Sequence, residues 1–141
     1  MSEIYFKRKN KQFFLWDNKA ISFEDYYRII DLIHNDIGKP YVLPIVLHKL
    51  FLFATNSKKY ISDVMPVNII KLNSEFILSA ENRNKQLVKI VLPKDIKDKH
   101  DVSVYSPVGV ACLGAKEKSQ ISLKYKDFNQ KLQIEKIVSQ P

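Results

Sequence analysis

The stretch Val102–Gly114, VSVYSPVGVACLG, contains the clearest local signals in this chain. Its first four residues, Val-Ser-Val-Tyr, read as a short β-strand. Ser106 is a favoured N-cap residue, and Pro107 is favoured at the first position of a helix. Gly114 is typical of the position just after a helix ends. The stretch therefore predicts a short strand followed by a helix of one to two turns over 107–113.

Strand patterns continue on both sides of this stretch. Upstream segments are rich in β-branched residues and are separated by the turn candidate Asn73-Ser74 and by Pro93. Downstream, two alternating segments flank 127–129 and indicate a closing hairpin. Because neighbouring strands are joined by short connections, we expect an antiparallel sheet. The expected strands are 67–72, 75–80, 86–92, 102–105, 121–125 and 131–138.

Two helices are expected before the sheet. Ser22 is a good N-cap, with Asp25 three positions on as a variant capping box. Pro44 opens a second helix that closes at 56–57. A brief loop between them predicts an antiparallel hairpin. The apolar residues expected on the two buried faces are Phe23, Tyr26, Tyr27, Ile30 and Ile33 in the first helix, and Leu43, Val46, Leu47, Leu50, Phe53 and Ala54 in the second.

The whole pattern predicts an α+β fold, in which a short antiparallel helical hairpin precedes an antiparallel β-sheet carrying one short helix. We expect three parts: a basic and aromatic N-terminal arm over 1–21, the hairpin over 22–60, and the sheet domain over 61–141. Two short strands are plausible within the arm, as is a segment that orders only against the main body.

The net positive charge of the chain indicates anionic partners but does not identify them. The chain has 141 residues and a net charge of +8, and 20 of its 23 basic residues are lysine. Bidentate hydrogen bonds to guanine or phosphate favour the guanidinium group of arginine over lysine. The lysine-rich composition of this chain therefore disfavours sequence-specific DNA recognition. Attraction to a polyanion, through the arm and the sheet lysines, or to an acidic protein surface stays open.

Catalysis finds little support among the residues. Three glycines do not form a phosphate-binding loop, one cysteine forms no metal-binding pair, and three histidines lack ligand spacing. We therefore expect no catalytic residues, no cofactor and no metal, and hence no enzyme. Without a membrane or targeting segment, and with a single cysteine, a reducing cytoplasmic location fits best. We expect a monomer; the single cysteine and the absence of a long heptad pattern argue against a disulfide-linked or coiled-coil dimer.

The segment Ser106–Gly114 resembles the SPxGxALxG signature of the C-terminal domain of bacterial Gre transcript-cleavage factors. It resembles still more the related regulator of nucleoside diphosphate kinase. The segment MPVNIIKLNS, residues 65–74, and the strand ending at Pro93 are similar to family features in the same order, and the resemblance covers about 22–138. Cys112 departs from the usual leucine or isoleucine, and 116–120 replaces a glycine-aspartate turn.

The resemblance implies an FKBP-like sheet domain that binds RNA polymerase at the rim of its secondary channel. The residues that the motif implies as polymerase contacts are Ser106, Pro107, Val108 and Gly109. Gre factors also carry a long coiled coil whose acidic tip holds a catalytic magnesium ion. Here each arm has about 12–14 residues, roughly 18–21 Å at 1.5 Å per residue. We name Asp36, Lys39 and Tyr41 as the candidate tip residues.

The tip sequence carries a single acid, Asp36, next to Lys39. One carboxylate beside an ammonium group is a poor magnesium site. We therefore expect a polymerase-binding regulator that acts by occupancy and does not stimulate transcript cleavage. Two other classes remain open: a polyanion or nucleic-acid binder, and a prolyl isomerase, which would need an aromatic-lined pocket in the sheet domain.

Overall fold

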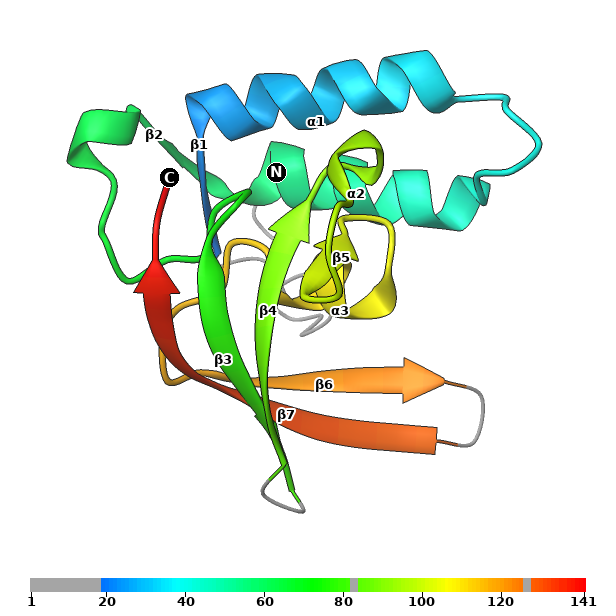
Figure 1. The fold of residues 1–141 in the computed structure, drawn as a ribbon. Helices are drawn as coiled ribbons and strands as arrows, with labels where there is room; N and C mark the ends of the chain where they lie inside the picture. The colour runs from blue at the N-terminus through cyan, green and yellow to red at the C-terminus, as the bar shows by residue number, and fades with distance from the viewer. Residues whose placement is uncertain (1–18, 82–83, 126–127) are drawn as a thin grey trace, which may run out of the picture.

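The computed structural model describes residues 19–81, 84–125 and 128–141 of the chain. Two helices form a hairpin that lies across one end of a curled β-sheet (Figure 1). The hairpin elements and the small sheet beside them are β1 (Ala20–Ser22), α1 (Phe23–Asp36), α2 (Pro44–Asn56), β2 (Lys58–Tyr60) and the 3₁₀ turn η2 (Ser62–Val64). The larger sheet domain contains β3 (Glu75–Ala80), β4 (Lys85–Val91), η3 (Pro93–Asp95), β5 (Asp101–Ser103), α3 (Pro107–Cys112), β6 (Gln120–Tyr125) and β7 (Phe128–Ser139).

The main sheet has the strand order β5-β4-β3-β7-β6. Helix α3 packs against both β5 and β6, which are the two edge strands of that sheet. A single short helix reaches both edges only because the sheet curls around it, as Figure 1 shows. The expected α+β architecture is confirmed, with one correction: β4 and β5 pair in parallel, so the sheet is mixed.

Both predicted helices are present with the predicted ends. The Ser22 hydroxyl accepts a hydrogen bond from the Asp25 amide at 3.0 Å, which caps α1. Pro44 occupies the first turn of α2, and Ser57 follows its last residue. The predicted apolar faces were partly wrong, because Phe23, Tyr27 and Leu43 are exposed.

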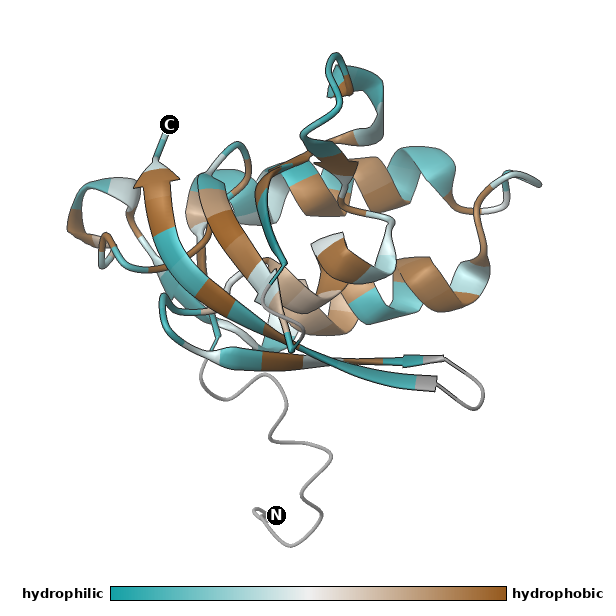
Figure 2. Ribbon diagram, turned by 60° about the horizontal axis from the view of Figure 1, so that its bottom comes forward, coloured by the Kyte–Doolittle hydropathy of each residue, from teal (hydrophilic) through white to brown (hydrophobic). Residues whose placement is uncertain are grey.

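Ile29, which the predicted stripe omitted, is fully buried in α1. It belongs to a core shared by the helical hairpin and the sheet. Figure 2 shows apolar residues running along both helices and alternating with polar ones along β7. The core residues with the least exposed side chains include Ile29, Leu50, Phe53, Ile70, Leu72, Phe76, Ile90, Val104, Cys112, Leu113 and Ile134.

The strand predicted over 67–72 is absent. This segment forms turns and one isolated bridge between Ile69 and Lys116. Its backbone groups find partners elsewhere: the Ile70 amide donates to the Ala115 carbonyl at 2.9 Å, and the Leu72 amide donates to the Asp25 carboxylate at 3.0 Å. The β-branched residues are therefore used for burial, while the backbone satisfies its hydrogen bonds without a regular strand.

The N-terminal strand β1 begins within the residues assigned to the arm and ends at Ser22, the first residue assigned to the hairpin. It pairs in parallel with β2, and Ala20 and Ile21 are buried. The two strands considered for the earlier part of the arm lie outside the described residues. Strand β3 matches its prediction and β4 is shifted by one residue. Strand β5 begins one residue before its predicted start and ends two residues before its predicted end, and β6 and β7 form the predicted closing hairpin.

Candidate partner-binding site

Ser106 fixes the start of α3. Its hydroxyl accepts a hydrogen bond from the Gly109 amide at 3.0 Å and donates one to the Ser103 carbonyl at 2.8 Å. The same side chain thus caps the helix and ties it to the end of β5. This geometry confirms the local structure predicted from the sequence and gives Ser106 a structural role.

Gly109 lets α3 approach β5 at backbone distance. A Cβ atom at this position would lie 2.2 Å from the Ser103 carbonyl oxygen and 3.0 Å from the Val104 Cα atom. Gly109 is buried, so its observed role is packing. Of the four candidate contacts, Pro107 is exposed and Val108 is half-buried against the core. A partner could therefore reach Pro107 directly and the edge of Val108.

Gly114 joins several segments at the other end of α3. It has φ +82°, and an added Cβ would lie 2.5 Å from a ring carbon of Phe53. Its amide donates to the Ile70 carbonyl at 2.9 Å, and its carbonyl accepts from the Ala20 amide at 3.2 Å. The last residue of the sequence motif therefore holds β1, α2 and the 65–74 segment together.

Lys19 caps the C-terminal end of α3. Its ammonium group donates to the Ala111 carbonyl at 2.8 Å and more weakly to the Val110 carbonyl at 3.4 Å. Burial lowers the pKa of Lys19 to about 8, while the nearby Cys112 thiol opposes this shift. Burial likewise raises the pKa of Cys112 to about 12. Such a thiol is protonated and unreactive near neutral pH, as expected for a buried cysteine.

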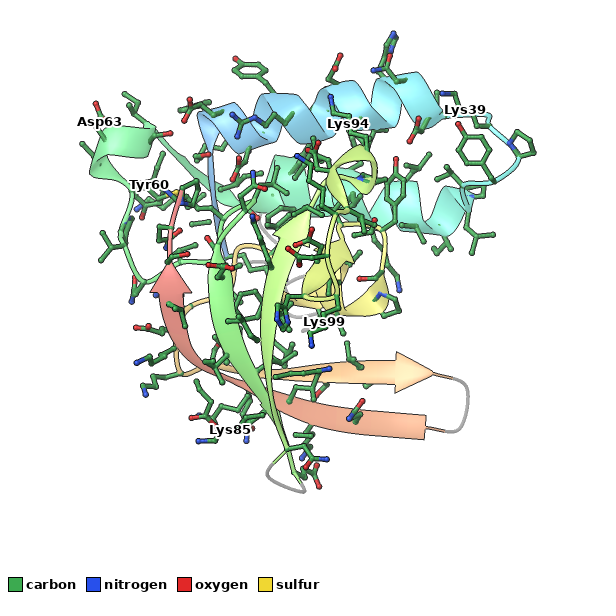
Figure 3. The ribbon with its side chains drawn as sticks, viewed as in Figure 1. Lys39, Tyr60, Asp63, Lys85, Lys94 and Lys99 are labelled. Atoms are coloured by element: carbon green, nitrogen blue, oxygen red, sulfur yellow. The ribbon has the colours of Figure 1, made fainter. Side chains whose placement is uncertain are left out.

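The candidate tip residues lie together where the hairpin turns. Asp36 ends α1, and its carboxylate accepts a hydrogen bond from the Lys39 ammonium group at 3.4 Å. That ammonium group also lies 5.9 Å from the centre of the Tyr41 ring, within range of a cation–π contact. Figure 3 shows Lys39 at the tip, away from the sheet.

A hydrogen bond connects the hairpin tip with the α3 segment. The Tyr105 hydroxyl donates to the second carboxylate oxygen of Asp36 at 2.5 Å. This bond is the main reason that the pKa of Asp36 is lowered, with Lys39 adding to the effect. Tyr105 directly precedes Ser106, so the structure brings together two candidate regions that are 69 residues apart.

Sequence reasoning did not single out Tyr105 as a functional residue. Its only signal was its place at the end of a predicted strand, which says nothing about a distant helix. The tip is also more apolar than its charges indicated. Four large side chains are between 55% and 74% exposed there, namely Ile37, Tyr41, Leu43 and Ile45.

The described residues offer few features of a catalytic centre. They contain no group of three or more histidine, cysteine, aspartate or glutamate side chains able to hold a metal ion. Two surface hollows, of about 310 and 380 Å³, have no aromatic residue in their walls. An aromatic pocket was the feature expected of a prolyl isomerase.

No described helix has the length and apolar character needed to cross a membrane.

No protein-family model and no curated protein matches this sequence. Among solved structures, the fold is similar to a prokaryotic transcription elongation factor GreA/GreB from Nitrosomonas europaea. The two chains are 19% identical, with a TM-score of 0.70 over 86% of this chain and 98% of the other. The GreA factor homolog 1 (Gfh1) protein of Thermus thermophilus aligns with 14% identity and a TM-score of 0.44, over 86% of this chain and 99% of its own.

The similarity to the Nitrosomonas structure establishes the fold. It is a Gre-like α+β fold: an N-terminal helical pair followed by a curled mixed sheet with one short helix. The alignment includes nearly the whole of that chain. The hairpin and the sheet domain therefore match as one arrangement, not as two separate fragments.

Proposed function

We propose that this protein binds RNA polymerase at the rim of the secondary channel and regulates transcription by occupying that site. The fold match with a TM-score of 0.70 is the observation that supports this most strongly. It agrees with the independent resemblance of Ser106–Gly114 to the Gre signature. In this proposal the docking surface centres on the exposed Pro107 and the accessible edge of Val108, at the start of α3.

We further propose that the protein does not stimulate transcript cleavage. Helices α1 and α2 have 14 and 13 residues, so each is about 20 Å long. The single acid near the tip, Asp36, already accepts hydrogen bonds on both carboxylate oxygens, from Lys39 and Tyr105. A short hairpin with an occupied carboxylate fits the resemblance to the regulator of nucleoside diphosphate kinase better than that to the cleavage factors.

Binding is tested by pull-down of purified protein with core RNA polymerase from the source organism, with and without a Gre factor as competitor. Pro107→Glu places a charge on the proposed docking surface and keeps a residue tolerated in the first turn of a helix. Pro66→Glu is the matched control, because Pro66 is also exposed but lies after η2.

We expect competable binding that Pro107→Glu reduces at least tenfold and Pro66→Glu leaves unchanged; tenfold corresponds to about 1.4 kcal/mol. Absence of binding at moderate salt would refute the polymerase proposal. An equal loss of binding in both variants would contradict a docking surface centred on the start of α3.

The proposed lack of cleavage is tested separately on backtracked elongation complexes. Addition of the protein should leave the transcript length unchanged, whereas a Gre factor shortens it. In a mixture, the protein should slow cleavage by the Gre factor through competition. Shortening by the protein alone, abolished in Asp36→Asn, would show that the tip carboxylate does hold a metal ion.

A further inference from the structure

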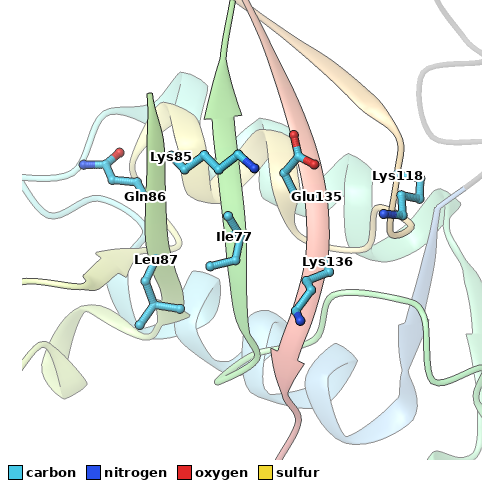
Figure 4. Close-up of a pocket in the computed structure, with 7 residues that line it drawn as sticks. All are labelled: Ile77, Lys85, Gln86, Leu87, Lys118, Glu135 and Lys136. Atoms are coloured by element: carbon cyan, nitrogen blue, oxygen red, sulfur yellow. The ribbon is translucent and has the colours of Figure 1, made fainter. Parts of the chain in front are cut away.

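A hollow of about 310 Å³ lies on the sheet away from α3 (Figure 4). Its floor is a row of three residues across adjacent strands, because Ile77 of β3 faces Leu87 of β4 on one side and Lys136 of β7 on the other. The remaining lining residues are Lys85, Gln86, Lys118 and Glu135.

A β-bulge in β7 shapes this hollow. Ile77 pairs with Lys136 but the next residue, Leu78, pairs with Ile134, so Glu135 is an extra residue in β7. A bulge re-aims side chains that would otherwise alternate between the two faces. Here Glu135 and Lys136, although adjacent in sequence, both line the same hollow.

Lys118 is held at the rim by a strained backbone. It has φ +73°, a region that few residues other than glycine adopt. Its amide donates to the Ile134 carbonyl at 2.8 Å, and its carbonyl accepts from the Gln133 side chain at 3.3 Å. These contacts fix the point from which the third lysine side chain extends.

The hollow has an excess of positive charge without internal pairing. Among the described residues, none of the three lining lysines forms an ion pair, and the two ion pairs present involve Arg28 and Lys39. The one lining acid, Glu135, already accepts a hydrogen bond from the Ser79 hydroxyl at 2.6 Å. Three lysines and one glutamate leave the lining of the hollow with a net charge of +2, which attracts anions.

We propose that this hollow binds the sugar-phosphate backbone of a single-stranded nucleic acid, independently of its sequence. Lysine ammonium groups act as point charges toward phosphates and do not read base edges. The aliphatic floor of Ile77 and Leu87 offers apolar contact but no aromatic ring for stacking. A hollow of about 310 Å³ admits one nucleotide unit, and a flexible single strand can adjust its backbone to the three lysines.

Fluorescence anisotropy of the full chain with a short labelled oligouridine tests the proposal, with oligothymidine and a DNA duplex of equal length as further arms. For single strands, the three lysines should contribute about −2 to the slope of log K against log salt. Lys85→Gln/Lys136→Gln should weaken binding about tenfold at low salt and reduce that slope by about 1.4.

Lys94→Gln/Lys99→Gln is the matched control, because it removes the same charge from exposed sites elsewhere; Figure 3 labels Lys85, Lys94 and Lys99. Basic residues of the N-terminal arm are present in all variants, so their contribution cancels in the comparison. Equal weakening by both pairs would overturn the proposal in favour of general attraction. Tighter binding to the duplex than to either single strand would also overturn it.

Glu135→Gln gives a second, opposite test. Glutamine can still accept the hydrogen bond from Ser79, while the negative charge in the hollow is lost. We expect binding to strengthen about threefold; no change would contradict the assigned site even if the double lysine variant proved unstable. Because the assay contains no polymerase, its outcome is separate from that of the proposed function.

Discussion

Single residues with little chemical functionality decide how the motif around α3 folds. Gly109 and Gly114 are both enclosed by neighbouring atoms, but for different reasons. Gly109 meets the backbone of β5, whereas Gly114 needs a positive φ and space beside Phe53. The two glycines of the Ser106–Gly114 signature are therefore explained by packing within this chain, apart from any contact with a partner.

Replacing Gly109 with alanine tests that packing requirement. The new Cβ would meet the Ser103 carbonyl oxygen at 2.2 Å, and moving α3 away from β5 would break the hydrogen bond that the Ser106 hydroxyl donates to the Ser103 carbonyl. We expect the free energy of unfolding to fall by about 3 kcal/mol, measured by urea denaturation. Gly38→Ala is the control, since Gly38 has φ +86° but open surroundings, and should cost only about 1 kcal/mol. Equal losses would show that the contact between α3 and β5 relaxes at little cost, which would contradict the packing requirement at Gly109.

Lys19 predicts an unusual pH dependence of stability. Its pKa is lowered from 10.5 to about 8 in the folded protein, so between these values the unfolded chain binds more protons. Stability from this group should therefore rise with pH from about 8. Above pH 9 the Cys112 thiol acts in the opposite direction, because its pKa is raised on folding.

The effect of Lys19 should thus be visible between pH 8 and 9, where it amounts to about 1 kcal/mol. Between pH 8 and 9, the melting temperature of the wild type should rise by more than that of Lys19→Met. Lys49→Met, at an exposed position of α2, should follow the wild type. Parallel curves for all three proteins would contradict a buried, charged Lys19.

At the scale of elements, local signals predicted the helices better than the strands. Ser22, Pro44 and Ser106 act within one turn of their own positions, so their roles could be predicted from neighbouring residues. The 65–74 segment could not, because Leu72 bonds to Asp25 and Ile70 to Ala115, partners that are distant in sequence. The same limit applies to Tyr105 and to the bulge at Glu135, since neither has a local sequence signature.

The link between α1 and the α3 segment can be tested with Tyr105→Phe. Loss of the phenol should raise the pKa of Asp36 toward its ordinary value, since that hydrogen bond is the largest cause of the lowered pKa. The stability supplied by the carboxylate is present above the ordinary pKa and is lost as pH falls through the lowered one. This acid-side loss should be smaller in the variant.

NMR titration of the Asp36 carboxyl group measures its pKa directly in the wild type and in Tyr105→Phe. Lys39→Gln provides the comparison and should also raise the pKa of Asp36, because the hydrogen bond from Lys39 and its charge are each smaller causes of the lowered pKa than the Tyr105 hydrogen bond. A larger effect of Lys39→Gln would mean that the tip, and not the bond to the sheet domain, controls this carboxylate.

For the whole molecule, the shared core is the dominant feature. Ile29 and Leu50 of the hairpin belong to the same buried cluster as Phe76 and Ile134 of the sheet. A separate hairpin would have to expose these side chains, at about 25 cal/mol for each Å² of apolar surface. The helical pair is therefore packed as part of the sheet domain's core and gains its stability there.

We expect the hairpin and the sheet to unfold in one transition. Urea denaturation followed by far-ultraviolet circular dichroism, which is dominated by the helices, should have the same midpoint as the loss of NMR signals from β3. Leu50→Ala should shift both midpoints together, by about 3 kcal/mol in free energy. If the circular dichroism signal of the helices is lost at a lower urea concentration than the NMR signals of β3, the hairpin opens independently of the sheet.

Cys112 lies at the end of α3, fully buried, and is the only cysteine of the chain. The native protein is therefore inert toward thiol reagents, and its rate of modification reports how often α3 detaches from the sheet. A cysteine introduced at an exposed position, such as Tyr41 on the tip, can be labelled selectively without removing the natural one. Distances from such a dye would locate the tip within any complex that the protein forms.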